Sequence, residues 1–330
     1  MAVYTQVPAE VLADFLKRYD VGTLRAAKGI AEGVENSNYL VDTSGADGAG
    51  ARFILTLYEK RVDVNDLPFF FALLDHLARQ GCPVPRFIPD RAGTVLQELC
   101  GRPACLIEFL SGVSVTEPTA AQARSAGAAL GQIHRAAEGF AGERANALGP
   151  AGWHRLAQAC GAHLDDIAPG LHARVRDELA FLDAHWPETL GHCVIHADLF
   201  PDNVLMQGDA VGGLIDFYFS CTDIRAYDVA ITHGAWCFSP DGSAFRPDVA
   251  HALIGGYGAA HGLTAAEYAA LPILGRGAAL RFLLTRAYDW INTPPGALVT
   301  RKDPLAYLRR LETYASGDPQ TLFGPAPVSA

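Results

Sequence analysis

Three oxygen-bearing side chains follow one another in an order that could transfer a phosphoryl group. Asp198 stands two residues after His196, and Asn203 and Asp216 come next along the chain. A carboxylate such as Asp198 can accept a hydroxyl proton, whereas a carboxamide and a second carboxylate offer the hard oxygen ligands that Mg²⁺ prefers when it bridges the phosphates of ATP. The spacing His-x-Asp-x-x-x-x-Asn is that of a kinase catalytic loop. We therefore predict Asp198 as the catalytic base and Asn203 and Asp216 as Mg²⁺ ligands.

Short apolar segments flank these groups and predict the strands that position them. Residues 193–195 lead into the loop, residues 203–206 lead out of it, and residues 211–217 carry the second carboxylate. We expect two antiparallel strands to hold the loop at one end, with that carboxylate beside it. The alternative is that the polar residues only cap a turn, because Asp and Asn are common there. Their order and their strand context favour the catalytic interpretation.

Length and charge favour an enzyme of two domains that acts on a small molecule. The chain has 330 residues, half of them hydrophobic, with 26 Lys and Arg against 36 Asp and Glu and a net charge of -10. This balance argues against nucleic acid or an anionic membrane as the main partner. No apolar run reaches the roughly 18 residues that a membrane span needs, and the first residues lack the pattern of a signal peptide. The oligomeric state stays open.

Cysteine and histidine usage indicates a reducing compartment and no transition metal. The seven cysteines form no Cys-x-x-Cys pair and are odd in number. We expect them to be reduced thiols of a cytoplasmic protein. The histidines show no spacing typical of a zinc site.

Hydrophobic periodicity divides the chain into two lobes of different composition. Residues 1–110 predict a small sheet with few helices, and residues 111–330 predict mainly helices, so the expected fold class is α+β. The expected helices cover residues 8–18, 67–80, 119–137, 152–166, 170–184, 226–238, 247–261, 265–288 and 303–314. The expected strands of the first lobe cover residues 24–31, 36–43, 51–58, 94–98 and 105–110. Residues 317–330 contain three prolines, and we expect a loosely ordered tail.

Together these motifs resemble the aminoglycoside phosphotransferase and choline kinase superfamily. The resemblance rests on residues 195–198, Asn203, residues 215–217 and residues 227–230, and softer likeness along the whole chain points to its homoserine kinase branch. It implies a protein-kinase-like fold of two lobes, with ATP and Mg²⁺ as cofactors and the hydroxyl of L-homoserine as acceptor, a step of threonine biosynthesis. Choline, methylthioribose or an aminoglycoside are the alternative acceptors. A nucleotide-binding pseudokinase is a further alternative.

The resemblance also assigns supporting roles to two buried polar residues. His196 matches a histidine that braces the catalytic loop, and Asp228 matches an aspartate that ties a helix start to that loop. We expect both to be structural, because buried polar groups usually brace backbone. His134 is expected to be a residue of the same kind.

The nucleotide-binding elements depart from the family pattern. Thr56 stands where the family usually has Lys or Arg against the phosphates, and the glutamate that would pair with that cation is also missing from residues 67–71. Lys60 or Arg61 are candidate replacements, and a solvated strand end is the alternative. Candidate phosphate-loop residues are Gly33, Asn36, Ser37 and Asn38. For adenine we expect the backbone of Glu108, Phe109 and Leu110.

Specificity for the acceptor is expected from the helical lobe. An amino-acid alcohol needs a cation for its carboxylate and a hydroxyl placed near the catalytic base. Candidate residues are Arg225, His233, Trp236, Arg281, Arg286, Tyr288, Asp289 and Trp290. Each of these residue types more often serves packing or surface roles. The Arg-rich segment 276–286 disfavours a polycationic aminoglycoside.

Overall fold

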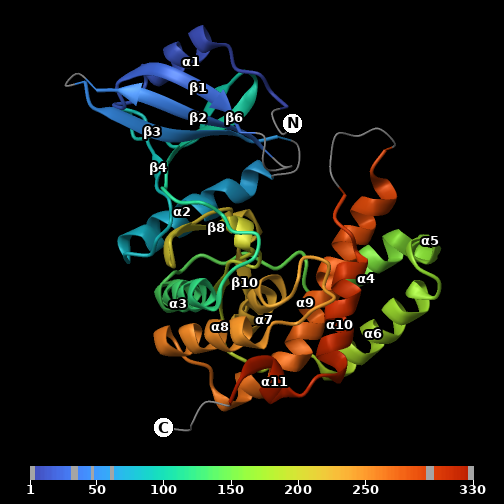
Figure 1. Cartoon of the computed structure of the whole chain (residues 1–330). Coiled ribbons are helices and arrows are strands. Elements are labelled where there is room, and N and C mark those ends of the chain that lie inside the picture. Colours follow the sequence, from blue (N-terminus) through green and yellow to red (C-terminus); the bar gives the residue numbers. More distant parts are fainter. Residues whose placement is uncertain (1–3, 31–35, 46–47, 60–62, 295–300, 326–330) are drawn as a thin grey trace. The chain divides into compact units, whose positions relative to one another are not determined.

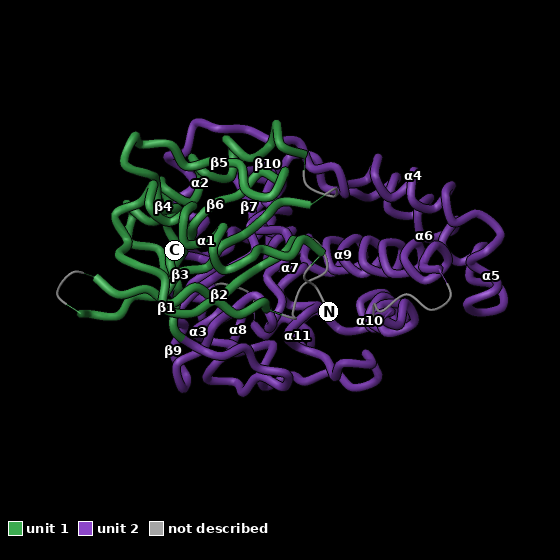
Figure 2. The backbone as a smooth tube through the Cα atoms, turned by 90° about the horizontal axis from the view of Figure 1, so that it is seen from above, with its two compact units in different colours: residues 1–111 green, residues 112–330 purple. Residues whose placement is uncertain are grey.

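The chain forms two compact units. The computed structural model describes residues 4–30, 36–45, 48–59, 63–294 and 301–325. One unit comprises Met1–Ser111 and the other Gly112–Ala330, as Figure 2 shows. The lobe boundary expected from the sequence, after residue 110, lies one residue before this division.

The first unit is built on an antiparallel sheet with the order β1-β2-β3-β6-β4, to which β5 adds by pairing with β6. Its strands are β1 (Thr23–Gly29), β2 (Ser37–Ser44), β3 (Gly50–Leu57), β4 (Phe87–Ile88), β5 (Gln97–Leu99) and β6 (Arg102–Glu108). Buried and half-buried residues alternate along β2, as expected for a strand whose two faces differ. Its register places Asn38 opposite Thr56 and Tyr39 opposite Leu55.

Two helices lie on opposite faces of this sheet (Figure 1), α1 (Ala9–Leu16) and α2 (Leu67–Arg79). Leu12 and Phe15 of α1 are buried in one core cluster with Val41 and Leu55 of the sheet. The helix α2 begins with a proline in its first turn, where the missing N–H costs no hydrogen bond. It reaches the sheet through Phe71, whose ring lies 4.5 Å from that of Phe87.

The second unit is mainly helical. Its helices are α3 (Ala120–Ala137), α4 (Pro150–Cys160), α5 (Leu164–Ile167), α6 (Leu171–His185), α7 (Arg225–Trp236), α8 (Pro247–Ala260), α9 (Ala265–Asn292), α10 (Leu305–Ser316) and α11 (Pro319–Phe323). None of the described helices combines the length and the apolar character that a membrane crossing requires. Helices α3 and α8 pack very closely at Gly127, where an added Cβ would lie 2.1 Å from the carbonyl oxygen of Leu253. This contact fixes the two helices that supply His134 and Tyr257 to the site described below.

Two short hairpin-like pairs interrupt the helices. Strand β7 (His192–Ile195) pairs with β10 (Cys221–Ile224), and β8 (Val204–Gln207) pairs with β9 (Ala210–Leu214). The strand expected over residues 211–217 therefore ends at Leu214, before the second carboxylate. The partner of β7 is β10, which the sequence pattern did not predict.

Two further expectations need correction. The helix expected over residues 152–166 is broken at Gly161, which has a φ of 51°, so that α4 and α5 are separate. The expected loose tail contains the helix α11, because Leu322 and Phe323 are buried and anchor it. Residues 326–330 lie outside the described part of the chain.

Candidate active site

The loop between β7 and β8 carries Asp198 and Asn203, and hydrogen bonds hold these two residues together. The Nδ2 group of Asn203 donates to the main-chain oxygen of Asp198 at 2.8 Å and to its Oδ2 at 3.3 Å. A short 3₁₀ turn, Pro201–Asn203, ends the loop. Because Nδ2 is engaged within the loop, Oδ1 is the amide oxygen left to contact a cation. The half-buried Asp198 is thus oriented by the same residue that offers a metal ligand.

Asp228, in the first turn of α7, fixes the start of this loop. Its carboxylate accepts the backbone N–H of His196 at 2.7 Å and that of Ala197 at 2.8 Å. Ala197 has a φ of 64°, in the left-handed region that non-glycine residues seldom occupy. Two charge-assisted hydrogen bonds to adjacent N–H groups can maintain such a conformation.

His196 links the loop to the segment that carries Asp216. Its Nδ1 accepts the backbone N–H of Asp198 at 3.2 Å, and its Nε2 donates to the carbonyl oxygen of Ile215 at 3.1 Å. Burial lowers the pKa of His196, which favours the neutral imidazole that these two contacts require. His196 therefore connects the segments that carry Asp198 and Asp216.

A buried chain of polar groups continues behind Asp228. Its Oδ2 lies 3.1 Å from Nε2 of His134, and Nδ1 of His134 lies 3.0 Å from the hydroxyl of Tyr257. Burial alone would raise the pKa of Asp228, but the hydrogen bond from His134 and the nearby imidazoles hold it below its ordinary value. The carboxylate is thus ionised and able to bind the loop. Tyr257 was missed at the sequence level, because a tyrosine within an apolar helix carries no motif.

Asp216 stands just beyond β9 in a conformation suited to exposing its carboxylate. Its φ is 65° and its ψ is 61°, so the chain turns sharply at this residue, and its side chain is exposed. The preceding N–H, of Ile215, donates to the carbonyl oxygen of Asn203 at 3.0 Å. The segments of Asn203 and Asp216 are therefore directly joined.

The donor set of these two residues fits Mg²⁺ better than a transition metal. Both offer oxygen atoms, and within the described residues no three His, Cys, Asp or Glu side chains come close enough to hold an ion. A cation that takes its remaining ligands from phosphate oxygens and water suits such a site.

In the first unit, several expected phosphate-loop residues are engaged within the protein. The hydroxyl of Ser37 accepts the N–H groups of Tyr4 at 2.8 Å and Thr5 at 3.0 Å, and it donates to Oε1 of Glu59 at 2.8 Å. Ser37 is fully buried. Its predicted role as a phosphate donor is therefore wrong, because its hydroxyl anchors the N-terminal segment to the sheet. Asn36 is also buried, and its Oδ1 lies 3.4 Å from the N–H of Glu59.

Thr56 and Asn38 bond to each other across β2 and β3. The Thr56 hydroxyl donates to Oδ1 of Asn38 at 2.8 Å. A neutral pair thus occupies the position where the resembling family usually has a cation. Glu59, just after β3, has a pairing role that sequence reasoning missed, since its Oε2 lies 3.1 Å from Nε of Arg102. The remaining candidates, Gly33 and Lys60, lie outside the described residues.

The segment predicted to face adenine follows the end of the central strand pair. The pairing of β3 with β6 ends at Glu108, whose N–H donates to the carbonyl oxygen of Arg86 at 2.8 Å. The backbone of Phe109 and Leu110 lies beyond that ladder, and the ring of Phe109 lies 5.8 Å from the guanidinium of Arg52. The side chain of Glu108 also turns back, with its Oε2 3.2 Å from the N–H of Arg86.

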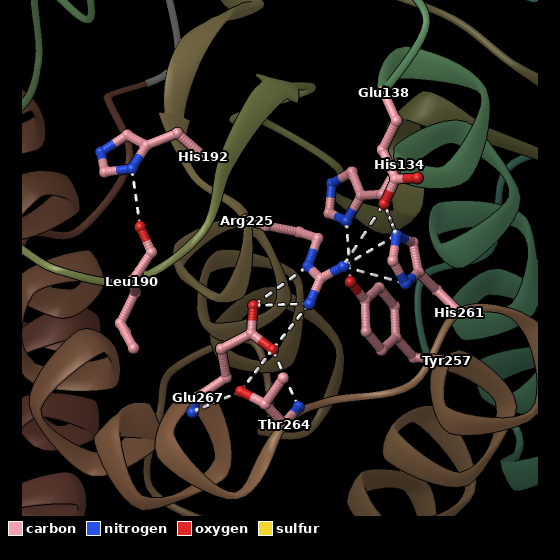
Figure 3. A network of polar contacts seen from close by, with 9 residues as sticks. All are labelled: His134, Glu138, Leu190, His192, Arg225, Tyr257, His261, Thr264 and Glu267. Atoms are coloured by element: carbon pink, nitrogen blue, oxygen red, sulfur yellow. Dashed lines mark hydrogen bonds and ion pairs between the residues drawn. The ribbon is translucent and has the colours of Figure 1, made fainter.

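Arg225 is held in a network of its own (Figure 3). Its guanidinium makes hydrogen bonds of 2.6 to 3.0 Å to the carboxylate of Glu267, and Nη1 lies 2.9 Å from Nε2 of His261. Glu267 is also the capping-box residue of α9 and binds Thr264. Arg225 therefore joins the start of α7 to the start of α9, and its predicted role as a substrate ligand is wrong.

Two other substrate candidates are also structural. His233 is fully buried, with Nδ1 2.6 Å from the hydroxyl of Tyr314 and Nε2 2.9 Å from the carbonyl oxygen of Leu322. Trp236 is buried and donates to the carbonyl oxygen of Leu199, the residue after Asp198, at 2.9 Å. Neither side chain is available to a substrate, because packing uses both.

The two substrate candidates Arg281 and Arg286, both on α9, differ in their contacts. Arg281 is buried and donates from Nη1 to the carbonyl oxygen of Ala197 at 2.6 Å, so it supports the catalytic loop. Arg286, one and a half turns further on, is half-buried and donates to the carbonyl oxygen of Asp303 at 3.1 Å. Among the candidates Arg225, His233, Trp236, Arg281 and Arg286, the last has the most donors left.

Comparison with known proteins agrees with this geometry. A model of the phosphotransferase enzyme family matches residues 26–263. A homoserine kinase of Methylobacterium radiotolerans is 55% identical over 94% of this chain and 95% of its own length. One of Azorhizobium caulinodans is 55% identical over 95% of this chain and 96% of its own length.

The solved structure of a spectinomycin phosphotransferase covers 96% of this chain and 100% of its own, with a TM-score of 0.70 at 13% identity. This likeness concerns the fold, and it confirms the protein-kinase-like α+β class with two lobes predicted from the sequence. The homoserine kinase relatives confirm the predicted branch. The chain belongs to the phosphotransferase enzyme family, on the branch that holds these homoserine kinases.

Proposed function

We propose that this protein transfers the γ-phosphoryl group of ATP to the hydroxyl of L-homoserine and forms O-phospho-L-homoserine for threonine biosynthesis. The observation that carries the proposal is the braced loop in which Asn203 orients Asp198, found in a chain more than half identical to homoserine kinases. Asp198 accepts the proton of the acceptor hydroxyl as the hydroxyl oxygen attacks the γ-phosphorus, and the bond from that phosphorus to the β–γ bridging oxygen breaks to release ADP. Asn203 Oδ1 and the Asp216 carboxylate would hold Mg²⁺, which would neutralise the triphosphate charge when bound.

Nucleotide binding is assigned to the first unit. The backbone beyond the ladder at Phe109 and Leu110 offers hydrogen-bonding groups for adenine, next to Glu108 at the strand end. Gly33 and Asn38 remain the phosphate-loop candidates, and Lys60 remains the candidate cation, since Thr56 is bonded to Asn38. The proposed domains are a nucleotide-binding lobe over residues 1–110 and a catalytic, substrate-binding lobe over residues 111–330.

The proposed setting is the cytoplasm, with a small-molecule substrate as the partner. All seven cysteines are free thiols, and six of them are buried. Burial raises the pKa of several of these thiols, that of Cys82 to about 11, which keeps them in the less reactive protonated form.

The experiment is a phosphorylation assay with Mg-ATP across L-homoserine, choline, methylthioribose and an aminoglycoside. We expect turnover with homoserine and a loss of kcat of roughly 10² to 10⁴ in Asp198→Asn, with ATP binding retained. Asp209→Asn is the matched control, because Asp209 is an exposed carboxylate in the turn between β8 and β9. Turnover of another acceptor alone would contradict the homoserine assignment. ATP binding without phosphorylation of any acceptor would favour the pseudokinase alternative.

A further inference from the structure

Arg286 is a half-buried cation whose donors are mostly unused. Its guanidinium lies 4.5 Å from the ring centroid of Tyr307, and its Nη1 donates to the carbonyl oxygen of Asp303 at 3.1 Å. Among the residues that the structure describes, no carboxylate lies within 4.0 Å of it. An arginine held in place but without an anionic partner is suited to bind one from a ligand.

Tyr307, on α10, has a buried hydroxyl without a hydrogen-bond partner within the described chain. The residue is only 1% exposed. Its ring is fixed by Phe282, 5.0 Å away, and by the guanidinium of Arg310, 4.5 Å away on the ring. A buried hydroxyl with no partner is uncommon and calls for a water or a ligand group. The hydroxyl of Tyr307 and the guanidinium of Arg286 are therefore hydrogen-bond donors on two side chains that contact each other in the second unit.

This pair lies beside the catalytic loop. Phe200, two residues after the catalytic base, packs against Phe282 at 4.9 Å and against Tyr307 at 6.4 Å. Burial lowers the pKa of Arg286, and the negative charge of Asp198 is among the influences that raise it. Burial raises the pKa of Tyr307, and the negative charge of Asp198 also raises it. Both groups are therefore within electrostatic reach of Asp198.

Arg281 and Arg310, the other two arginines of this region, are buried and hydrogen-bonded to backbone carbonyl groups. Arg281 is 1% exposed and binds the carbonyl oxygen of Ala197. Arg310 is 4% exposed and donates to the carbonyl oxygens of Gly234, Ala306 and Ser239. Of these three arginines, Arg286 is the one that a small solute can reach.

We propose that Arg286, assisted by the hydroxyl of Tyr307, binds the α-carboxylate of the acceptor and so selects amino-acid alcohols over simple amino alcohols. The proposal deepens the proposed function and rests on it. With the carboxylate on Arg286, a short acceptor directs its hydroxyl toward Asp198. A site built around an anion discriminates strongly against an analogue that lacks it, because the cation is then left unpaired.

The test compares two acceptors that differ only in this group. 3-Aminopropan-1-ol is L-homoserine without its carboxylate. In Arg286→Gln, we expect kcat/KM for L-homoserine to fall about 100-fold and that for 3-aminopropan-1-ol to change less than about threefold. Arg286→Lys should lose an intermediate amount for homoserine, because it keeps the charge but not the planar fork. Tyr307→Phe should lose roughly three- to tenfold for homoserine alone.

Arg301→Gln is the matched control. Arg301 also donates to a backbone carbonyl, that of Trp290 at 3.2 Å, and also stacks on a ring at 4.5 Å, but it is exposed. This variant should leave both acceptors unchanged. Equal losses for both acceptors in Arg286→Gln would overturn the proposal, since they would indicate a positioning role, and so would an unchanged preference in Arg286→Lys.

A binding measurement separates this proposal from the proposed function. L-2-Aminobutyrate has the ammonium and carboxylate groups of homoserine but no hydroxyl. Its binding, followed by calorimetry, should weaken about 100-fold in Arg286→Gln, and this result would support the carboxylate site even if homoserine were not phosphorylated. Equal binding to both proteins, or none to the unaltered protein, would overturn the carboxylate site. Failure of the unaltered protein to phosphorylate homoserine would instead contradict the proposed function.

Discussion

Asp228 accepts the backbone N–H groups of His196 and Ala197, the two residues immediately before Asp198. The carboxylate is fully buried and is hydrogen-bonded to His134 from the opposite side. In the proposed reaction its contribution is thus indirect, because it fixes the backbone from which the Asp198 side chain projects. The position of the start of α7 therefore determines the backbone conformation of the loop.

Asp228→Asn should therefore lower kcat and stability together. The amide has one oxygen in place of two, so one loop N–H faces an NH₂ group and stays unsatisfied. We expect a loss of about 1–3 kcal/mol in the free energy of unfolding and a fall in kcat with little change in KM for ATP. Urea denaturation and steady-state kinetics measure both. Asp177→Asn, at an exposed carboxylate of α6, is the control. If Asp228→Asn changed kcat and the free energy of unfolding as little as this control does, the bracing role would be contradicted.

Arg281, on α9, binds the same residue of the loop, Ala197. It donates to the carbonyl oxygen of Ala197, whose φ of 64° needs support from its surroundings. Arg281→Met should lower kcat roughly 10- to 100-fold without a matching change in KM for ATP, because a small displacement of the base is costly. Arg281→Lys should recover part of that loss, since it keeps a donor and the charge. Wild-type turnover in the Met variant would show that the loop holds its shape unaided.

His233 makes stability depend on pH. Burial lowers its pKa from 6.5 to about 4, so the unfolded chain binds a proton that the folded chain does not. The stabilisation is complete above about pH 6.5 and is lost as the pH falls toward 4, by on the order of 3 kcal/mol. His196, whose pKa burial also lowers, acts in the same direction. His233→Gln should reduce this pH dependence in urea unfolding between pH 7 and 4, and an unchanged slope would contradict the assignment.

The sequence predicted that His196, Asp198 and Asn203 share one loop, because their spacing is a local pattern. The spacing of Asp198 and Asn203 requires a tight loop, and His196 adds a group that can bond on both sides. The lobes followed from the change in periodicity near residue 110. Both inferences depend on local patterns of spacing and periodicity, which are visible in the sequence without knowledge of tertiary contacts.

The errors arose where a side chain's partner lies far away in the chain. The sequence suggested that Ser37 donates to a phosphate, but its hydroxyl is hydrogen-bonded to Tyr4, Thr5 and Glu59. Arg225 reads as a free cation, yet Glu267, 42 residues later, holds it (Figure 3). Charge and polarity are visible in a sequence, but the partner that satisfies them is set by tertiary packing.

The strand ends were also missed for a physical reason. Apolar residues continue from Leu214 through Phe217, so the pattern extends the strand past Asp216. The left-handed conformation of Asp216 ends it instead, and aspartate adopts this conformation only occasionally, so its presence in the sequence does not predict the turn.

The conformation of Asp216 allows its charge and its backbone to be tested separately. Asn tolerates the left-handed region, so Asp216→Asn should keep the fold while removing the carboxylate ligand. We expect turnover to fall at least 100-fold, with a higher Mg²⁺ requirement for what remains. Asp216→Gly should be equally inactive but up to about 1 kcal/mol more stable, because glycine adopts a φ of 65° without strain. Mg²⁺ titration of activity and urea unfolding of both variants check this, and an Asn variant that works at ordinary Mg²⁺ would show that Asp216 is not a metal ligand.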